Sequence, residues 1–147
     1  PGDAVVGLAS AGIHANGFSL VRRIVGDGDF DADLLLPATR CYLDDVRALR
    51  ARADVRALAH VTGGGIAGNL ARVLPAGVGA VVDPGSWERL PVFDWLAAHG
   101  VPEDELRRVF NLGIGYCAVI PAAQVTAADT LIGRIESGVD GVAWADR

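Results

Sequence analysis

Near its start the chain reads AVVGLASAGIHANGFSLVRRIV over residues 4–25, and this stretch decides the fold. Residues 4–9 are a short apolar run, which predicts a buried strand. Residues 10–17 are polar and rich in glycine, which predicts a loop. Residues 18–25 place their apolar side chains on one face of a helix and two arginines on the other. The stretch therefore predicts a strand, a loop and a helix in direct succession.

The rest of the chain continues this alternation of strands and helices. We expect helices at residues 40–52, 65–73, 91–100, from 102 onward and at 121–130, and strands at residues 55–61, 78–82, 116–120, 132–135 and 142–144. Thr39 is expected to cap the helix at 40–52, and the last two strands to form a closing hairpin around Ser137 and Gly138. The pattern predicts a single α+β domain over residues 1–147, a layered α/β/α structure with a mixed central sheet.

The charge balance narrows the possible ligands. The chain has 13 basic and 18 acidic residues, a net charge of −5, and every basic residue is an arginine. Binding to nucleic acid or to a membrane surface favours clustered positive charge, so we expect neither partner. No apolar run approaches the roughly 20 residues of a membrane-spanning helix. Without lysine there is no P-loop or Schiff-base lysine, so backbone amides, helix ends or arginines must hold any phosphate.

The two cysteines carry no sign of a metal or disulfide site. Cys41 and Cys117 stand far apart, with no CxxC pair and no cluster of histidines beside them. Together with the lack of a secretory signal, this predicts reduced thiols in a cytoplasmic protein. The acidic stretch at residues 27–33 fails the EF-hand pattern at its sixth and twelfth positions, so we expect no metal ligands there.

The first glycine-rich loop has the composition of an anion site. Its backbone N–H groups precede a helix, whose positive end favours negative charge. Glycines let the backbone approach a ligand closely, and short polar side chains add hydrogen bonds. The candidate ligands in this loop are Ser10, Gly12, His14, Asn16, Gly17 and Ser19. A tight strand-to-helix turn, with His14 as a hydrogen-bonded structural residue, explains the same residues equally well.

A second glycine-rich turn follows the strand expected at residues 55–61. Gly63, Gly64 and Gly65 open a helix and suit phosphate. The stretch at residues 63–68 also matches G-x-G-x-x-G, and Asp83 follows Gly63 by 20 positions. A dinucleotide-binding module that uses Gly63, Gly65, Gly68 and Asp83 is therefore an alternative.

Thr39 and Arg40 complete the candidate site residues. A guanidinium suits phosphate or carboxylate oxygens, so this pair could contact an anionic ligand near the start of a helix. A helix cap followed by a surface arginine accounts for the same two residues.

Five stretches in this order resemble the phosphoribosylformylglycinamidine cyclo-ligases, also called aminoimidazole ribonucleotide synthetases. The matching stretches are Gly2-Asp3 with the strand that follows, GIHANGFSLVR at residues 12–22, PATRCY at 37–42, HVTGGG at 60–65 and FNLGIG at 110–115. The resemblance covers residues 1 to about 135 and concerns only the C-terminal half of the family. It places the first residue, Pro1, at a cut point in a longer protein.

The resemblance implies an enzyme of purine biosynthesis. Members of the family use ATP to convert formylglycinamidine ribonucleotide to aminoimidazole ribonucleotide, and most ligands for ATP and Mg²⁺ lie in an N-terminal half that this sequence lacks. The family shares its two-domain plan with thiamine-monophosphate kinase. The intact enzyme is expected to be a homodimer whose N-terminal domain completes the site. The two glycine-rich loops would hold phosphates, while His14 and Asn16 would orient the substrate, with His14 as a candidate catalytic proton acceptor.

The resemblance also implies that these 147 residues are inactive alone, because half of the cleft is missing. The remaining alternative is a non-catalytic domain that completes another chain's site.

Overall fold

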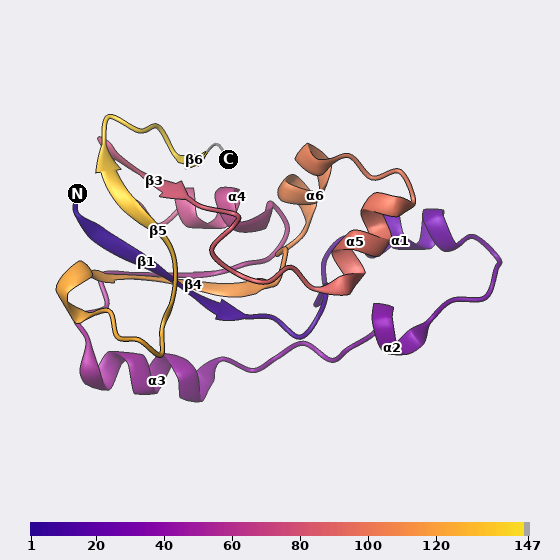
Figure 1. Ribbon diagram of the computed structural model, residues 1–147, viewed down its shortest axis with the longest axis horizontal. Helices are drawn as coiled ribbons and strands as arrows, with labels where there is room; N and C mark the ends of the chain where they lie inside the picture. The colour runs from indigo at the N-terminus through magenta and orange to yellow at the C-terminus, as the bar shows by residue number, and fades with distance from the viewer. Residues whose placement is uncertain (146–147) are drawn as a thin grey trace.

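The computed structural model describes residues 1–145, and its centre is a six-stranded sheet (Figure 1). The strands are β1 (Asp3–Ala9), β2 (Ala57–His60), β3 (Val78–Val82), β4 (Ile114–Pro121), β5 (Thr130–Ser137) and β6 (Val142–Trp144). The helices are α1 (Phe18–Val25), α2 (Ala32–Leu35), α3 (Leu43–Arg52), α4 (Gly65–Ala71), α5 (Pro91–Ala98) and α6 (Glu103–Val109), and a 3₁₀ turn covers Ala122–Gln124. Among the described residues, no helix is long and apolar enough to cross a membrane.

The sheet is mixed, as the sequence predicts. Its strand order is β2-β4-β1-β5-β3-β6. The central strand β1 pairs antiparallel with β4 and β5, and β2 pairs antiparallel with the other side of β4. Strands β3 and β6 are parallel to each other. Because β1 and β2 both run against β4, their carboxyl ends lie at the same edge of the sheet.

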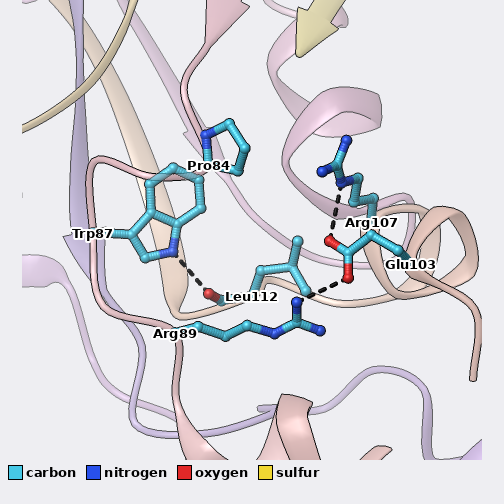
Figure 2. Close-up of a pocket in the computed structure, with 6 residues that line it drawn as sticks. All are labelled: Pro84, Trp87, Arg89, Glu103, Arg107 and Leu112. Carbon is cyan, nitrogen blue, oxygen red and sulfur yellow. Dashed lines mark hydrogen bonds and ion pairs between the residues drawn. The ribbon is translucent and has the colours of Figure 1, made fainter. Parts of the chain in front are cut away.

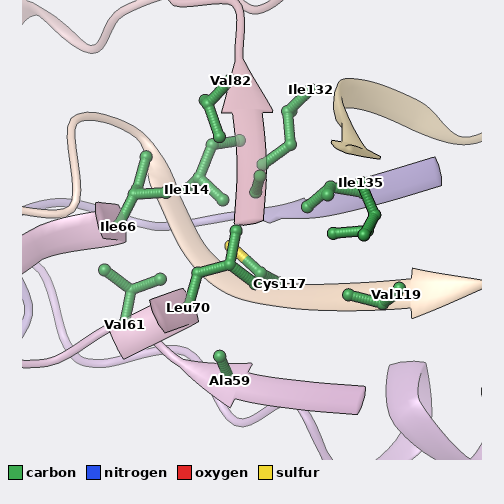
Figure 3. Packing of buried hydrophobic residues seen from close by; sticks show 12 residues of the cluster. Ala59, Val61, Ile66, Leu70, Val82, Ile114, Cys117, Val119, Ile132 and Ile135 are labelled. Atoms are coloured by element: carbon green, nitrogen blue, oxygen red, sulfur yellow. The ribbon is translucent and has the colours of Figure 1, made fainter. Parts of the chain in front are cut away.

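Helices cover both faces of the sheet, which confirms the layered α/β/α fold. On one face Ile66 and Leu70 of α4 pack into a cluster that includes Val5 of β1 (Figure 3). On the other face Leu49 of α3 packs against Val6 and its neighbours on β4. Successive strand residues point to opposite faces, so the continuous apolar run in β1 is buried on both sides.

A second core lies beyond one end of the sheet, where α1, α2, α5 and α6 gather (Figure 1). Phe93 and Leu96 of α5, Leu106 of α6 and Phe110 after α6 are fully buried in it. Ile13, from the first glycine-rich loop, is buried in the same core. The second core thus packs against the first glycine-rich loop through Ile13.

The expected closing hairpin is wrong. Strands β5 and β6 do not pair with each other, because β3 lies between them and pairs with both. Gly133 of β5 has no side chain, and a Cβ there would overlap the carbonyl oxygen of Val81 on β3. Strand β3 therefore occupies the position beside β5 that the hairpin prediction gives to β6.

Two helix predictions also need correction. Residues 121–130 form one short 3₁₀ turn and then a bend, in which Asp129 accepts hydrogen bonds from the backbone N–H and hydroxyl of Thr126. Such side-chain bonds compete with helix formation. The helix expected at residues 40–52 begins only at Leu43, and its N-cap is Tyr42, so Thr39 is not the cap.

Candidate functional site

The two glycine-rich loops lie beside each other at one edge of the sheet. The first follows the carboxyl end of β1 and the second follows the carboxyl end of β2, which the strand order places at the same edge. A Cβ on Gly63 would lie 3.5 Å from Oδ1 of Asn16, so the two loops lie close together at these residues. One ligand can therefore touch both loops.

The side chain of Asn111 holds the first glycine-rich loop by hydrogen bonds. Its amide is buried, with the residue 3% exposed. Its Oδ1 accepts hydrogen bonds from the Ser10 hydroxyl at 2.8 Å and from the Gly113 backbone N–H at 2.9 Å. Its Nδ2 donates to the Gly12 carbonyl at 2.8 Å. Asn111 thus holds the first loop, and the Ser10 hydroxyl uses its one donor in this contact.

Gly17 allows α1 to start tightly against the second core. Its φ of +83° lies in the left-handed region, which favours glycine. A Cβ at this position would overlap the ring of Phe110. No side chain caps the N-terminus of α1. The first backbone N–H groups of this helix therefore have no side-chain acceptor.

Both loops contain backbone N–H groups that have no hydrogen-bond partner among the described residues. Among residues 1–145, no hydrogen-bond acceptor pairs with the backbone N–H of Gly12, Gly17 or Ser19 in the first loop. The same holds, within these described residues, for the N–H groups of Gly63 and Gly64 in the second. Unpaired backbone donors at the start of a helix are the usual protein ligands of phosphate oxygens.

Gly65 differs from its two neighbours. Its N–H donates to the Thr62 carbonyl at 3.2 Å. A Cβ on Gly65 would overlap the carbonyl oxygen of Arg107, so the residue lets α4 pack against α6. Gly65 therefore has a packing role, and its binding of phosphate stays a prediction.

Asn69 holds the second loop in the way that Asn111 holds the first. It is 6% exposed, and its Nδ2 donates to the Gly65 carbonyl at 2.8 Å. Its Oδ1 accepts from the Thr62 hydroxyl at 3.0 Å and from Nη1 of Arg72 at 3.2 Å. The other end of that guanidinium, Nη2, lies 3.6 Å from where a Cβ on Gly64 would be. Arg72 therefore adds a positive charge beside the unpaired amides.

His14 is a structural residue of the first loop. It is 4% exposed, with a left-handed φ of +58°. Its Nε2 accepts a hydrogen bond from the Ala11 N–H at 3.1 Å, and its Nδ1 is buried with no partner among the described residues. Burial, and then the charge of His60, lower the pKa of His14. Nε2 of His14 is thus engaged within the loop, and the role of His14 as a proton acceptor stays a prediction.

Arg40 and Tyr42 tie the segment before α3 to the end of β1. Nη1 of Arg40 and the hydroxyl of Tyr42 both donate to the Ala9 carbonyl, at 3.1 and 2.9 Å. Nη2 of Arg40 also pairs with Asp45 at 2.6 Å. Burial raises the pKa of Tyr42 to about 12, so its hydroxyl stays protonated as a donor. Thr39 is exposed and lies next to this tether.

Sequence reasoning missed the residues that hold the loops. Asn111, Asn69 and Tyr42 stand inside or close to the stretches that carry the family resemblance, but nothing in their spacing shows which loop they hold. Two of the three partners of Asn111, Ser10 and Gly12, lie 101 and 99 positions away in the chain. A side chain that bridges distant segments leaves no local signal in the sequence.

The strand order rules out the dinucleotide-binding alternative. That motif needs the strands on either side of its helix to be adjacent and parallel. Here β2 and β3 flank α4 in sequence, but β4, β1 and β5 lie between them in the sheet. Asp83 accepts a hydrogen bond from the Gly85 N–H at 2.8 Å and shapes the turn after β3, far in the sheet order from Gly63 and Gly68.

Comparison with known proteins identifies the family. Residues 1–137 match the family model described as "AIR synthase related protein, C-terminal domain". The chain is 43% identical over 147 residues to the phosphoribosylformylglycinamidine cyclo-ligase of Exiguobacterium sibiricum, covering 91% of this chain and 43% of the relative. It is 46% identical over 139 residues to the same enzyme of Parasynechococcus marenigrum, covering 85% of this chain and 40% of the relative.

Solved structures show the same fold at low sequence identity. AaThiL complexed with AMPPCP and TMP aligns with a TM-score of 0.62 and 18% identity, over 97% of this chain and 47% of that one. The thiamine monophosphate kinase of Aquifex aeolicus aligns with a TM-score of 0.61 and 18% identity, over 97% and 50%. In each case this chain spans about half, or less, of the protein that it matches. The chain therefore belongs to the AIR synthase-related family, and what it represents is that family's C-terminal domain.

Proposed function

We propose that this chain supplies one wall of the active site of a phosphoribosylformylglycinamidine cyclo-ligase. The curated relatives at 43–46% identity carry that name, and the chain spans only 40–43% of their length. The other wall, most of the ATP contacts and the dimer contacts would then come from the N-terminal domain. The observation that carries the proposal is that two loops lie close together and both contain backbone N–H groups without a hydrogen-bond partner among the described residues.

In this proposal the loops hold phosphate groups without lysine. The N–H groups of Gly12, Gly17 and Ser19 would donate to one set of phosphate oxygens. Those of Gly63 and Gly64, with Arg72 beside them, would donate to a neighbouring set. Asn16 stands where the loops meet, with its Oδ1 close to Gly63, so its amide would orient the substrate.

The chemistry of the cyclo-ligase needs positioning and charge stabilisation more than covalent help. The formyl amide oxygen attacks the γ-phosphorus of ATP and ADP leaves. An amidine nitrogen of the same substrate then attacks the activated carbon, and phosphate leaves as the ring closes with loss of a proton. Fixed N–H donors can stabilise the charge that develops on the transferred phosphoryl group. Holding amide and phosphate close supplies the rest of the acceleration.

This chain offers no ligand set for Mg²⁺ in the part that the structure describes. Among residues 1–145 there is no group of three or more histidine, cysteine, aspartate or glutamate side chains that could hold a metal ion. We assign the Mg²⁺ that accompanies ATP, the homodimer contacts and the cytoplasmic setting to the intact enzyme. No residue of this chain is given a role toward the metal.

A chimera tests the proposal. Residues 1–147 replace the matching C-terminal segment of the Exiguobacterium sibiricum cyclo-ligase, and ADP release is followed with formylglycinamidine ribonucleotide as substrate. We expect ring closure by the chimera and none by residues 1–147 alone. An inactive but folded chimera that still binds ATP would contradict the proposal, and so would activity of the 147-residue chain by itself. Activity restored by mixing the two parts as separate chains would favour a domain that completes another chain's site.

A further inference from the structure

A further pocket lies between the turn after β3 and helix α6, and its lining residue Arg107 packs against Gly65 of the second glycine-rich loop (Figure 2). Its volume is about 370 Å³, which is in the range of pockets for small molecules. The residues that line it are Pro84, Trp87, Arg89, Glu103, Arg107 and Leu112. None of these residues has a role in the function proposed above.

One wall of this pocket is flat and apolar. The indole of Trp87 is held in place because its Nε1 donates to the Leu112 carbonyl at 2.8 Å (Figure 2). The ring of Pro84 stands next to it among the lining residues. A fixed indole face with proline and leucine beside it suits a planar ring, which would bury apolar surface there.

The opposite wall carries two guanidinium groups that share one carboxylate. Nη1 of Arg89 donates to Oε2 of Glu103 at 2.8 Å, and Nε of Arg107 donates to Oε1 at 3.1 Å. Burial alone would raise the pKa of Glu103, but the hydrogen bonds and charges of the two arginines outweigh it and lower the pKa. Glu103 is therefore ionised and acts as a bridging anion.

The bridge leaves other donors of the two guanidinium groups, of which Nη2 of Arg89 donates to the Phe93 carbonyl at 3.4 Å. Nε of Arg89 is buried and has no hydrogen-bond partner among the described residues, and the nearest carboxylate oxygen, on Asp94, is 3.5 Å away. The guanidinium of Arg107 extends over the ring of Trp144, 4.8 Å from its centre. A buried donor without an acceptor costs free energy, and a ligand oxygen would remove that cost.

We propose that this pocket binds a small planar ring that carries one phosphate or carboxylate group. The anionic group bridges Arg89 and Arg107 in place of Glu103, and the ring lies against Trp87. The Glu103 side chain is 46% exposed, so it can turn into water when the ligand enters. Bidentate contacts with guanidinium groups suit both phosphate and carboxylate.

The test follows the indole N–H signal of Trp87 by NMR in the 147-residue chain, with phenyl phosphate, benzoate and inorganic phosphate as separate probes. We expect saturable shifts with phenyl phosphate or benzoate, and affinity about tenfold weaker for inorganic phosphate, which lacks the ring. Whichever of the two ring compounds binds more tightly identifies the anionic group. Equal affinity for inorganic phosphate would overturn the role of the ring, and no shift with any probe would overturn the site.

Three variants test whether Arg89 and Glu103 take part in ligand binding or form only a structural ion pair. Arg89→Gln should weaken binding about tenfold. Arg108→Gln is the control, because Arg108 lies on α6 outside the pocket lining and, among residues 1–145, forms its ion pair with Glu105, and binding should be unchanged. Glu103→Gln removes the competing anion and should tighten binding severalfold. Weaker binding by folded Glu103→Gln would contradict the proposal that the ligand's anionic group takes the place of Glu103.

The amide signals of Gly63 and Gly64, which do not line this pocket, show in the same spectra whether the glycine-rich loops bind the probe. If Gly63 and Gly64 shift while Trp87 does not, the pocket proposal fails and the proposed function stands. If the Trp87 signal shifts and the glycine signals do not respond to phosphate, the pocket proposal stands and the proposed function fails.

Discussion

Replacing Asn111 by alanine should destabilise the protein and loosen the first glycine-rich loop. The change removes three hydrogen bonds, to the Ser10 hydroxyl, the Gly12 carbonyl and the Gly113 N–H, in a place where the side chain is 3% exposed. Each bond contributes about 1 kcal/mol net, and stranded buried groups cost about 1–3 kcal/mol each. Water that enters the space left by the amide recovers part of this.

We therefore expect the free energy of unfolding to fall by about 3–5 kcal/mol, a large share of the roughly 5–15 kcal/mol typical of a domain. The melting temperature should fall by roughly 10 °C. Denaturant unfolding followed by circular dichroism measures the change, and the loop amides should become more mobile by NMR relaxation.

The control is Asn16→Ala in the same loop. Asn16 is half-buried and makes no side-chain hydrogen bond among the described residues, so this change should cost less than about 1 kcal/mol. A loss below 1 kcal/mol for Asn111→Ala, or equal losses for the two variants, would refute the view that Asn111 holds the loop.

Three further changes test other contacts. Gly17→Ala should cost about 2–4 kcal/mol in denaturant unfolding, because the left-handed φ and the overlap with Phe110 both oppose a Cβ; an unchanged midpoint would contradict this. Tyr42→Phe should cost only about 1 kcal/mol by the same measurement, since Arg40 still donates to the Ala9 carbonyl, and a loss above 3 kcal/mol would show a larger role for the hydroxyl. The pKa of His14 is lowered from its ordinary 6.5, so the neutral form stabilises the fold above about pH 6.5 and that stability is lost as the pH falls further. His14→Asn should therefore flatten the stability profile between pH 7 and pH 5, and an unchanged slope would contradict the assignment.

The sequence predicts most of the layers of this fold, because local patterns carry them. The apolar run around Val5 and Val6 shows a buried strand, and the periodicity after Gly17 shows a helix. The position of β6 could not be predicted, because it depends on β3 reaching Gly133 from far along the chain. Residues 121–130 misled the prediction because an Asp129–Thr126 turn outweighs a weak helical tendency.

The candidate site was predictable in its backbone and not in its side chains. Glycine-rich turns after strands indicate where N–H groups are free, and parallel β1 and β2 bring two such turns together. Which side chains hold the loop depends in part on distant partners. The Ser10 hydroxyl donates to Asn111, 101 positions away, whereas Nε2 of His14 accepts from the Ala11 N–H three residues before it.

An NMR titration of the ¹⁵N-labelled 147-residue chain with ribose 5-phosphate tests whether the two glycine-rich loops bind one phosphorylated ligand together. We expect the amide signals of Gly12 and Gly17 to shift together with those of Gly63 and Gly64, along one binding curve with a single Kd. Shifts confined to one loop, or no shift at any of the four glycines at saturating ribose 5-phosphate, would contradict it.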